Sequence, residues 1–227
     1  MTATPASERI RGRIELLIPA LVRAGDRLIE HPRVRELYPE YLFTSHSVIR
    51  ASVPLMEAAL VEARATAAYD PVSAALAPYL EEHIDEERDH DEWLLDDLEV
   101  LGRDRREILV RPPSPTVAAL VGAQYYWIFH YHPVTLLGYV SLLEGYPPST
   151  ELIQRLIDAT GYPREGFRTM IAHAELDPGH RDELNELLDS LPLTSEQSGA
   201  LGVSAIQTVD LFTRAIDELV DEYAVAA

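Results

Sequence analysis

Two segments of the chain repeat one spacing of residues that commonly bind metal ions. Each follows the pattern His-x3-acid-x2-His, first at His83, Glu87 and His90 and again, 90 positions later, at His173, Asp177 and His180. About 0.05 such matches are expected by chance for this composition and length. Positions i, i+4 and i+7 of a helix lie within about 60° of one another, so each triplet should point to one side of its helix. Two facing triplets predict a pocket of four imidazoles and two carboxylates.

This donor set indicates the kind of metal. The chain has no cysteine, so its donors are nitrogen and oxygen only. Imidazole and carboxylate ligands favour iron or manganese over structural zinc, and the set is too rich in nitrogen for calcium or magnesium. Carboxylate-x-x-His pairs on facing helices, here Glu87 with His90 and Asp177 with His180, are also how helical bundles build dinuclear iron sites.

Glu144 supplies a further carboxylate of the kind that such a site needs. It is the only formally charged residue between Pro112 and Thr150, it follows a run of apolar residues, and Gly145 behind it is typical of a helix end. A carboxylate at a helix C-terminus opposes the helix dipole, and its burial without a partner is costly. We therefore expect a cation beside Glu144.

A purely structural interpretation of the first triplet is also open. His83 and His90 could form ordinary ion pairs with neighbouring acids on a solvated helix face, each contributing about a few tenths of a kcal/mol. Glu86 is a weaker ligand candidate than Glu87, because it is out of phase with the second triplet. One triplet alone would favour this interpretation, whereas two triplets together with Glu144 favour the metal site.

The second triplet contains a sequence that commonly interrupts a helix. Asp177-Pro178-Gly179 is a good N-cap followed by proline at the first helical position. We therefore expect a kink or local unwinding between His173 and His180.

The remaining histidines and the aromatic residues carry less specific signals. Four histidines are expected to be structural: His31, His46, His130 and His132. Tyr139 is near enough to Glu144 in sequence to line a substrate pocket. Tyr126 is a second pocket candidate, from an aromatic cluster that otherwise favours core packing.

Apolar residues recur at helical spacing through most of the chain, so the sequence predicts an all-α fold. Loops of two to eight residues favour an antiparallel bundle of seven or so helices, and no linker divides residues 1–227 into separate domains. The expected helices are Ser7–Glu30 with Ser7 as N-cap and a kink at Pro19, Arg33–Leu42, one opening at Ser45, Pro71–Gly102, Pro115–Gly145 with a kink at Pro133, Ser149–Gly161, Arg164–Leu191 and Thr194–Ala224.

Composition excludes several classes of function. The formal net charge of −19 repels nucleic acid and anionic membranes. The absence of cysteine removes zinc ribbons, iron–sulfur clusters and cysteine nucleophiles. The charged N-terminal segment lacks the apolar stretch of a signal peptide, and no segment is apolar enough to span a bilayer, so we expect a cytoplasmic protein.

Three segments together resemble the heme-oxygenase-like diiron oxidases, often labelled iron-containing redox enzymes. They are HIDEERDHDEWLLDDLEVLG, HYHPVTLLGYVSLLEG and HAELDPGHRDELNELLDSLP, within the stretch from about Pro71 to Pro192. The resemblance implies a seven-helix heme-oxygenase-like bundle with a labile centre of two Fe(II) ions, with manganese as an alternative metal and dioxygen as co-substrate. Thiaminase-type relatives fit less well, because their cysteine nucleophile is absent here.

The resemblance also implies a ligand set. It assigns Glu87, His90 and His173 to one iron and Glu144, Asp177 and His180 to the other, with Glu87 able to bridge. The family's alternative carboxylate lies seven residues before the first histidine ligand, and here that position is His83. His83 is therefore either an additional ligand or a residue that orients a ligand, and we favour the ligand role.

From these residues and the resemblance we expect an oxidase or oxygenase that modifies an amino-acid-like or fatty-acid-like small molecule, with natural-product biosynthesis as one setting. A homodimer is an open option for its assembly. The alternatives are a ferritin-like iron-handling protein without a substrate, and a metal-free binding protein or cofactorless oxidase.

Overall fold

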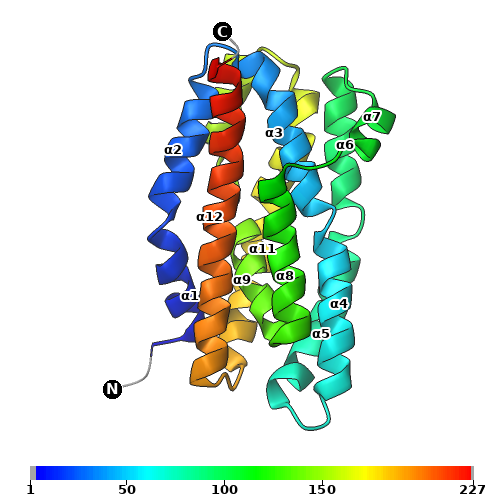
Figure 1. The fold of residues 1–227 in the computed structure, drawn as a ribbon, viewed down its shortest axis with the longest axis vertical. Helices are drawn as coiled ribbons and strands as arrows, with labels where there is room; N and C mark the ends of the chain where they lie inside the picture. The colour runs from blue at the N-terminus through cyan, green and yellow to red at the C-terminus, as the bar shows by residue number, and fades with distance from the viewer. Residues whose placement is uncertain (1–3, 226–227) are drawn as a thin grey trace.

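A computed structural model describes residues 4–225, and within this range every regular element is a helix. The all-α prediction is therefore confirmed. The helices run lengthwise in a bundle, with α12 along its long axis beside α2 and α8 (Figure 1). In chain order they are α1 (Ala6–Glu15), α2 (Ile18–Ile29), α3 (Val34–Ile49), α4 (Ser52–Thr66), α5 (Pro71–Glu87), α6 (His90–Val100), α7 (Arg105–Val110), α8 (Pro115–His130), η1 (Pro133–Leu136), α9 (Leu137–Leu143), α10 (Thr150–Thr160), η2 (Arg164–Phe167), α11 (Arg168–Ser190) and α12 (Ser195–Val225).

The sequence predicts that the first histidine triplet lies on one continuous helix, but the structure divides this helix in two. The predicted helix from Pro71 to Gly102 is divided into α5 and α6, because Arg88 is extended and Asp89 has a left-handed φ of 68°. In a continuous helix, the like-charged side chains of Glu87 and Asp91, four residues apart, would be neighbours on the helix surface and would repel each other. The break instead creates a new helix N-terminus, where Asp91 and Glu92 interact favourably with the dipole.

The second triplet shows the opposite deviation from the prediction. The expected break between His173 and His180 is absent, and α11 runs through residues 168–190. Proline removes one backbone donor, but the helix continues where surrounding elements hold it in place. The start of α11 is held by Asp97 on α6, whose carboxylate accepts hydrogen bonds from the backbone N–H groups of Arg168 and Thr169 at 3.2 and 2.9 Å.

Side-chain caps set several helix starts where the sequence predicted them. Asp70 accepts from the N–H groups of Val72 and Ser73 at the start of α5, and Ser149 accepts from Leu152 at the start of α10. Before α12, Thr194 and Gln197 bond each other's backbone N–H reciprocally, which is a capping box. The single helix expected from Pro115 to Gly145, with a kink at Pro133, is instead divided: α8 ends at His130, and η1 and α9 follow from Pro133.

Two predictions near the N-terminus are wrong in detail. The expected first helix is divided at Leu16–Leu17, which puts Pro19 in the first turn of α2, where its missing N–H costs nothing. Ser7 is not the N-cap, because α1 follows Pro5 and the Ser7 N–H and hydroxyl both donate to Asp189. A third prediction is also wrong, because no helix opens at Ser45. Ser45 is buried inside α3, which continues to Ile49, and the next helix, α4, begins at Ser52.

The core consists of two clusters of buried apolar side chains. One is built mainly from α1, α4, α5, α8, α9 and α12, and the other mainly from α2, α3, α6, α10 and η2. Both clusters contact Leu21 and Phe212. Among the described residues, no helix has the length and apolar composition needed to cross a membrane.

His46 is an exception within this packing. Its side chain on α3 is 1% exposed, and neither ring nitrogen has a hydrogen-bond partner among the described residues. Burial lowers the pKa of His46 to about 4, with Arg50 and Arg105 acting in the same direction and Asp91 opposing them. The imidazole is therefore neutral in the folded chain.

Replacing His46 with leucine should stabilise the fold, increasingly so in acid. A folded-state pKa below the ordinary 6.5 means that the unfolded chain takes up the proton first, so the wild type loses stability as the pH falls from about 6.5 towards 4. The full shift corresponds to roughly 3 kcal/mol. Urea unfolding across this range should show His46→Leu gaining on the wild type, whereas the exposed His130→Leu should not. A pH-independent difference would contradict this assignment.

Candidate metal centre

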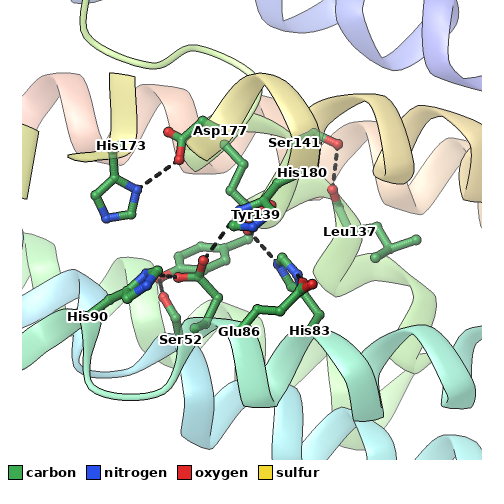
Figure 2. A network of polar contacts seen from close by, with 12 residues as sticks. Ser52, His83, Glu86, His90, Leu137, Tyr139, Ser141, His173, Asp177 and His180 are labelled. Atoms are coloured by element: carbon green, nitrogen blue, oxygen red, sulfur yellow. Dashed lines mark hydrogen bonds and ion pairs between the residues drawn. The ribbon is translucent and has the colours of Figure 1, made fainter. Parts of the chain in front are cut away.

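Four helices bring the seven predicted ligand candidates to one place inside the bundle. His83 and Glu87 lie near the end of α5, His90 begins α6, Glu144 directly follows α9, and His173, Asp177 and His180 lie on α11. Figure 2 shows the α11 side chains facing those of α5 and α6 across the pocket. All seven side chains are buried or nearly so.

One half of the site is built around His90 and His173. Their rings are perpendicular, with centroids 5.1 Å apart. The His90 Nδ1 lies 3.0 Å from Glu87 Oε2, and the His173 Nδ1 lies 2.8 Å from Asp177 Oδ1. Asp177 thus contacts the histidine that the resemblance assigns to the other iron.

The other half is built around His83 and His180 in the same way. These rings are also perpendicular, with centroids 5.3 Å apart. The His83 Nε2 lies 2.8 Å from Glu144 Oε1. His83, Glu87 and Glu144 each offer a ligand atom, and these atoms all lie within 4.8 Å of one another.

Glu87 lies between the two halves. Its Oε2 contacts His90, while its Oε1 is 3.6 Å from His180 Nδ1. Each half therefore holds two imidazoles and one carboxylate of its own, and shares Glu87 with the other. A carboxylate between two pairs of imidazoles is positioned to bridge two cations.

The unpartnered atoms of these side chains fit such cations. Four buried polar atoms of the site have no hydrogen-bond partner in the described structure: Glu87 Oε1, Glu144 Oε2, His173 Nε2 and His180 Nδ1. Buried polar atoms are rarely left unpaired, because each costs about 1–3 kcal/mol. Metal ions are one way to satisfy all four, and nitrogen and carboxylate donors without sulfur suit iron or manganese.

Electrostatics support the same interpretation. Burial raises the pKa of Glu144. Burial acts in the same direction on Glu87, but the hydrogen bond and charge of His90 outweigh it, so the pKa of Glu87 is lowered. Burial acts to lower the pKa of His83, but the hydrogen bond and charge of Glu144 raise it to about 9. Without a metal, protons on imidazoles therefore supply the positive charge that the carboxylates need.

Neighbouring residues fix the imidazoles in place. Trp93 packs against His90 with ring centroids 4.0 Å apart, and Tyr79 stacks on His83 at 5.1 Å. Glu86 is not part of the pocket between the triplets, but its Oε2 lies 3.1 Å from His83 Nδ1 and fixes that ring's orientation. The roles of Trp93, Tyr79 and Asp97 were not predicted from the sequence. The signal available there was spacing, because Trp93 lies three residues after His90 and Tyr79 four residues before His83.

The other candidates lie elsewhere. Tyr139 is buried, and its hydroxyl contacts Ser52 Oγ at 2.8 Å. Tyr126 was expected to line a substrate pocket, but this prediction is wrong, because its side chain is 62% exposed on α8 and does not line the cavity described below. His132 caps η1 and pairs with Asp70, and His31 accepts from the Arg33 N–H, so both have structural roles.

A cavity of about 610 Å³ opens onto the site. Glu87, Glu144, His173 and Asp177 form part of its wall together with Tyr139. The rest is mostly apolar, including Leu21, Leu28, Ile29, Leu42, Val48, Ile49, Met56, Leu94, Leu142, Leu143, Phe212 and Ile216. The structure thus combines a carboxylate–imidazole cluster with a largely apolar chamber, which is typical of a small-molecule site.

Comparison with solved structures defines the class of protein as one with a heme oxygenase-like fold. A domain of unknown function with that fold from Shewanella denitrificans OS217 superposes with a TM-score of 0.82 at 18% identity, covering 99% of this chain and 95% of the other. A CADD-like protein of unknown function from Nostoc punctiforme PCC 73102 gives 0.69 at 17% identity, over 95% and 97% of the chains. A TenA homologue from Pseudomonas syringae pv. tomato DC3000 gives 0.66 at 14% identity, over 91% and 92%.

The family follows from the sequence match. Residues 45–212 match the model of the iron-containing redox enzyme family, and the chain belongs to that family. The matched range includes all seven ligand candidates. No curated protein matches the chain.

Gly145 is a steric requirement for placing Glu144. A Cβ at this position would lie 2.2 Å from the Ser141 carbonyl oxygen, so Gly145→Ala should displace the end of α9 and cost about 1–3 kcal/mol of unfolding free energy. At Gly122, on an open face of α8, an added Cβ meets nothing within 4 Å. Gly122→Ala should therefore stabilise the helix by about 0.5–1 kcal/mol. Urea unfolding of both variants tests this, and equal effects would contradict the steric explanation.

Proposed function

We propose that this protein is a dioxygen-dependent non-heme diiron oxidase or oxygenase that modifies a small molecule. The observation that carries the proposal is the paired arrangement of imidazoles about Glu87, with four unpartnered buried donor atoms, at the wall of an apolar cavity. Membership of an iron-containing redox enzyme family supports iron as the metal.

His90, His173 and Asp177 would hold one iron, and His83, His180 and Glu144 the other, with Glu87 shared. Two Fe(II) ions with few protein ligands supply the electrons and the open coordination positions at which dioxygen can be reduced. The ligand set implied by the family resemblance differs in two respects. It assigns Asp177 to the iron of His180, whereas this grouping assigns Asp177 to the iron of His90, and this grouping makes His83 a ligand.

The chain's own residues supply the setting for this chemistry. Trp93 and Tyr79 restrict the rotation of His90 and His83, so the ligand geometry is set before metal binds. Apolar side chains line the approach to Glu87 and Glu144, so a bound apolar substrate would exclude water from the reacting groups. The Tyr139 hydroxyl is engaged by Ser52 and the Val48 carbonyl, so Tyr139 contributes shape to the cavity wall rather than a free hydroxyl.

The cavity favours a fatty-acid-like substrate over an amino-acid-like one. Its volume of about 610 Å³ and its aliphatic walls fit an elongated apolar molecule. A small zwitterion would leave most of these walls uncovered. A ferritin-like iron-handling protein has no need of such a chamber, so the cavity also favours the oxidase over that alternative.

Anaerobic addition of Fe(II) should load about two high-spin iron ions per chain, because the site offers two sets of imidazole and carboxylate donors. Exposure to dioxygen in the presence of medium-chain fatty acids should then consume dioxygen and yield oxidised product. Iron at background level by metal analysis would contradict the diiron site, and dioxygen uptake without any product would favour the iron-handling alternative.

The variant Glu144→Gln isolates the metal role in the same experiment. The amide has the same shape but cannot replace the carboxylate as an anionic ligand, so we expect about one iron fewer and no turnover, with the helical circular dichroism unchanged. Full activity in Glu144→Gln would show that Glu144 is no ligand, and unfolding would show a structural role.

His83 tests the grouping of ligands. If it binds iron, His83→Ala should reduce the iron content by about one ion per chain. If it only orients Glu144 through the 2.8 Å contact, iron content should stay at the wild-type level while activity falls about 10-fold to 100-fold. We expect the loss of iron. His130→Ala is the matched control, because His130 is exposed on α8 and lies outside the cluster.

A further inference from the structure

The metal-site cavity has polar groups at a second place, where it reaches the surface. Its exposed lining residues come from α2, from Ser149 and from α10. Asp26 on α2 and Arg155 on α10 lie there, with the Arg155 Nη2 3.1 Å from Asp26 Oδ1. Both side chains are partly exposed, at 44% for Arg155 and 40% for Asp26. The opening of the cavity therefore lies between these two helices.

Arg155 is the only guanidinium that lines the cavity among the described residues. Its contact with Asp26 uses one nitrogen, and no other acceptor lies within hydrogen-bond distance of its side chain in the described structure. An arginine has five N–H donors arranged to hold a carboxylate through two hydrogen bonds. The contact with Asp26 shows that the Arg155 guanidinium can hold a carboxylate oxygen here, and most of its N–H donors remain available for another acceptor.

Charge is distributed unequally between the two ends of the cavity. The inner end holds the carboxylates of Glu87, Glu144 and Asp177, whereas the opening holds Arg155 together with Asp26 and Glu151. The whole chain carries a formal charge of −19, which disfavours the approach of an anion. An anionic ligand that enters this cavity therefore needs a local cation, and Arg155 is the group that offers one away from the metal ligands.

We propose that Arg155 is a specificity-determining residue that binds the carboxylate of an elongated apolar substrate at the opening, in exchange for its contact with Asp26. The apolar chain then extends along the aliphatic walls, and its far end faces Glu87 and Glu144. In this orientation the carbon nearest the metal centre is remote from the carboxylate. That chemical consequence rests on the proposed function. Binding itself does not require iron.

The test uses the full chain without added iron and measures Kd by calorimetry for decanoate, 1-decanol and decylamine, which share one apolar chain. The wild type should bind decanoate most tightly. Arg155→Gln should raise the Kd of decanoate about 10-fold and leave that of 1-decanol unchanged, because only the carboxylate loses a charged partner. Arg155→Lys should recover part of the loss. Asp26→Asn should lower the Kd of decanoate, because it removes the competing carboxylate.

Arg27→Gln is the matched control. Arg27 is also on α2 and pairs with Asp217 and Asp221, but it does not line the cavity. Its loss should leave all three Kd values unchanged. An unchanged decanoate Kd in Arg155→Gln, equal weakening of decanoate and 1-decanol, tighter binding of decylamine, or no binding of decanoate by the wild type would each overturn the proposal. Iron content, measured separately, decides the proposed function independently of these results.

Discussion

Three carboxylates are concentrated inside the bundle, and the surrounding helices must supply the groups that balance their charge. Glu87, Glu144 and Asp177 are all buried, and the positively charged partners of their carboxylates among the described residues are imidazoles. Burying even one unpaired carboxylate costs several kcal/mol, so three in one place require compensating positive charge. Protonated histidines can supply part of it, as the raised pKa of His83 indicates. Two divalent cations would balance the carboxylates more completely and would also bind the four donor atoms that lack partners.

The helices around the site are shaped by the need to place these donors. The break at Arg88 and Asp89 lets α6 begin at His90, so that Glu87 and His90 contact each other across a helix junction. On the opposite side α11 remains continuous, and Asp97 of α6 caps its first turn. This cap ties the helix that carries His90 directly to the helix that carries His173. The two members of one imidazole pair are therefore positioned by a single buried carboxylate outside the candidate metal site.

Much of the fold and of the site could be predicted from local sequence, and the remainder depends on contacts between distant residues. Helical periodicity, the Asp70-Pro71 start and the Thr194 cap identified elements that the structure contains. The repeated triplet and Glu144 identified side chains that the structure brings together. The helix break was placed in the wrong triplet, because the sequence shows the proline at 178 but not the left-handed backbone at Asp89 that separates α5 from α6. The contact of Asp177 with His173, and the meeting of Asp26 with Arg155 across 129 positions, arise only when the helices pack.

The cavity connects the charge cluster to the surface in a way that assigns different tasks to its two ends. At the inner end, aromatic rings pack against the imidazoles and hold the candidate donor set in place, as chemistry at a metal would require. At the opening, Arg155 and Asp26 are partly exposed and joined by a single contact, so they can exchange partners at little cost in free energy. The aliphatic walls between the two ends would bind any apolar chain of suitable length by area alone and would not orient it. Orientation must therefore come from the ends, and the opening is the end at which a cation is available in the absence of metal.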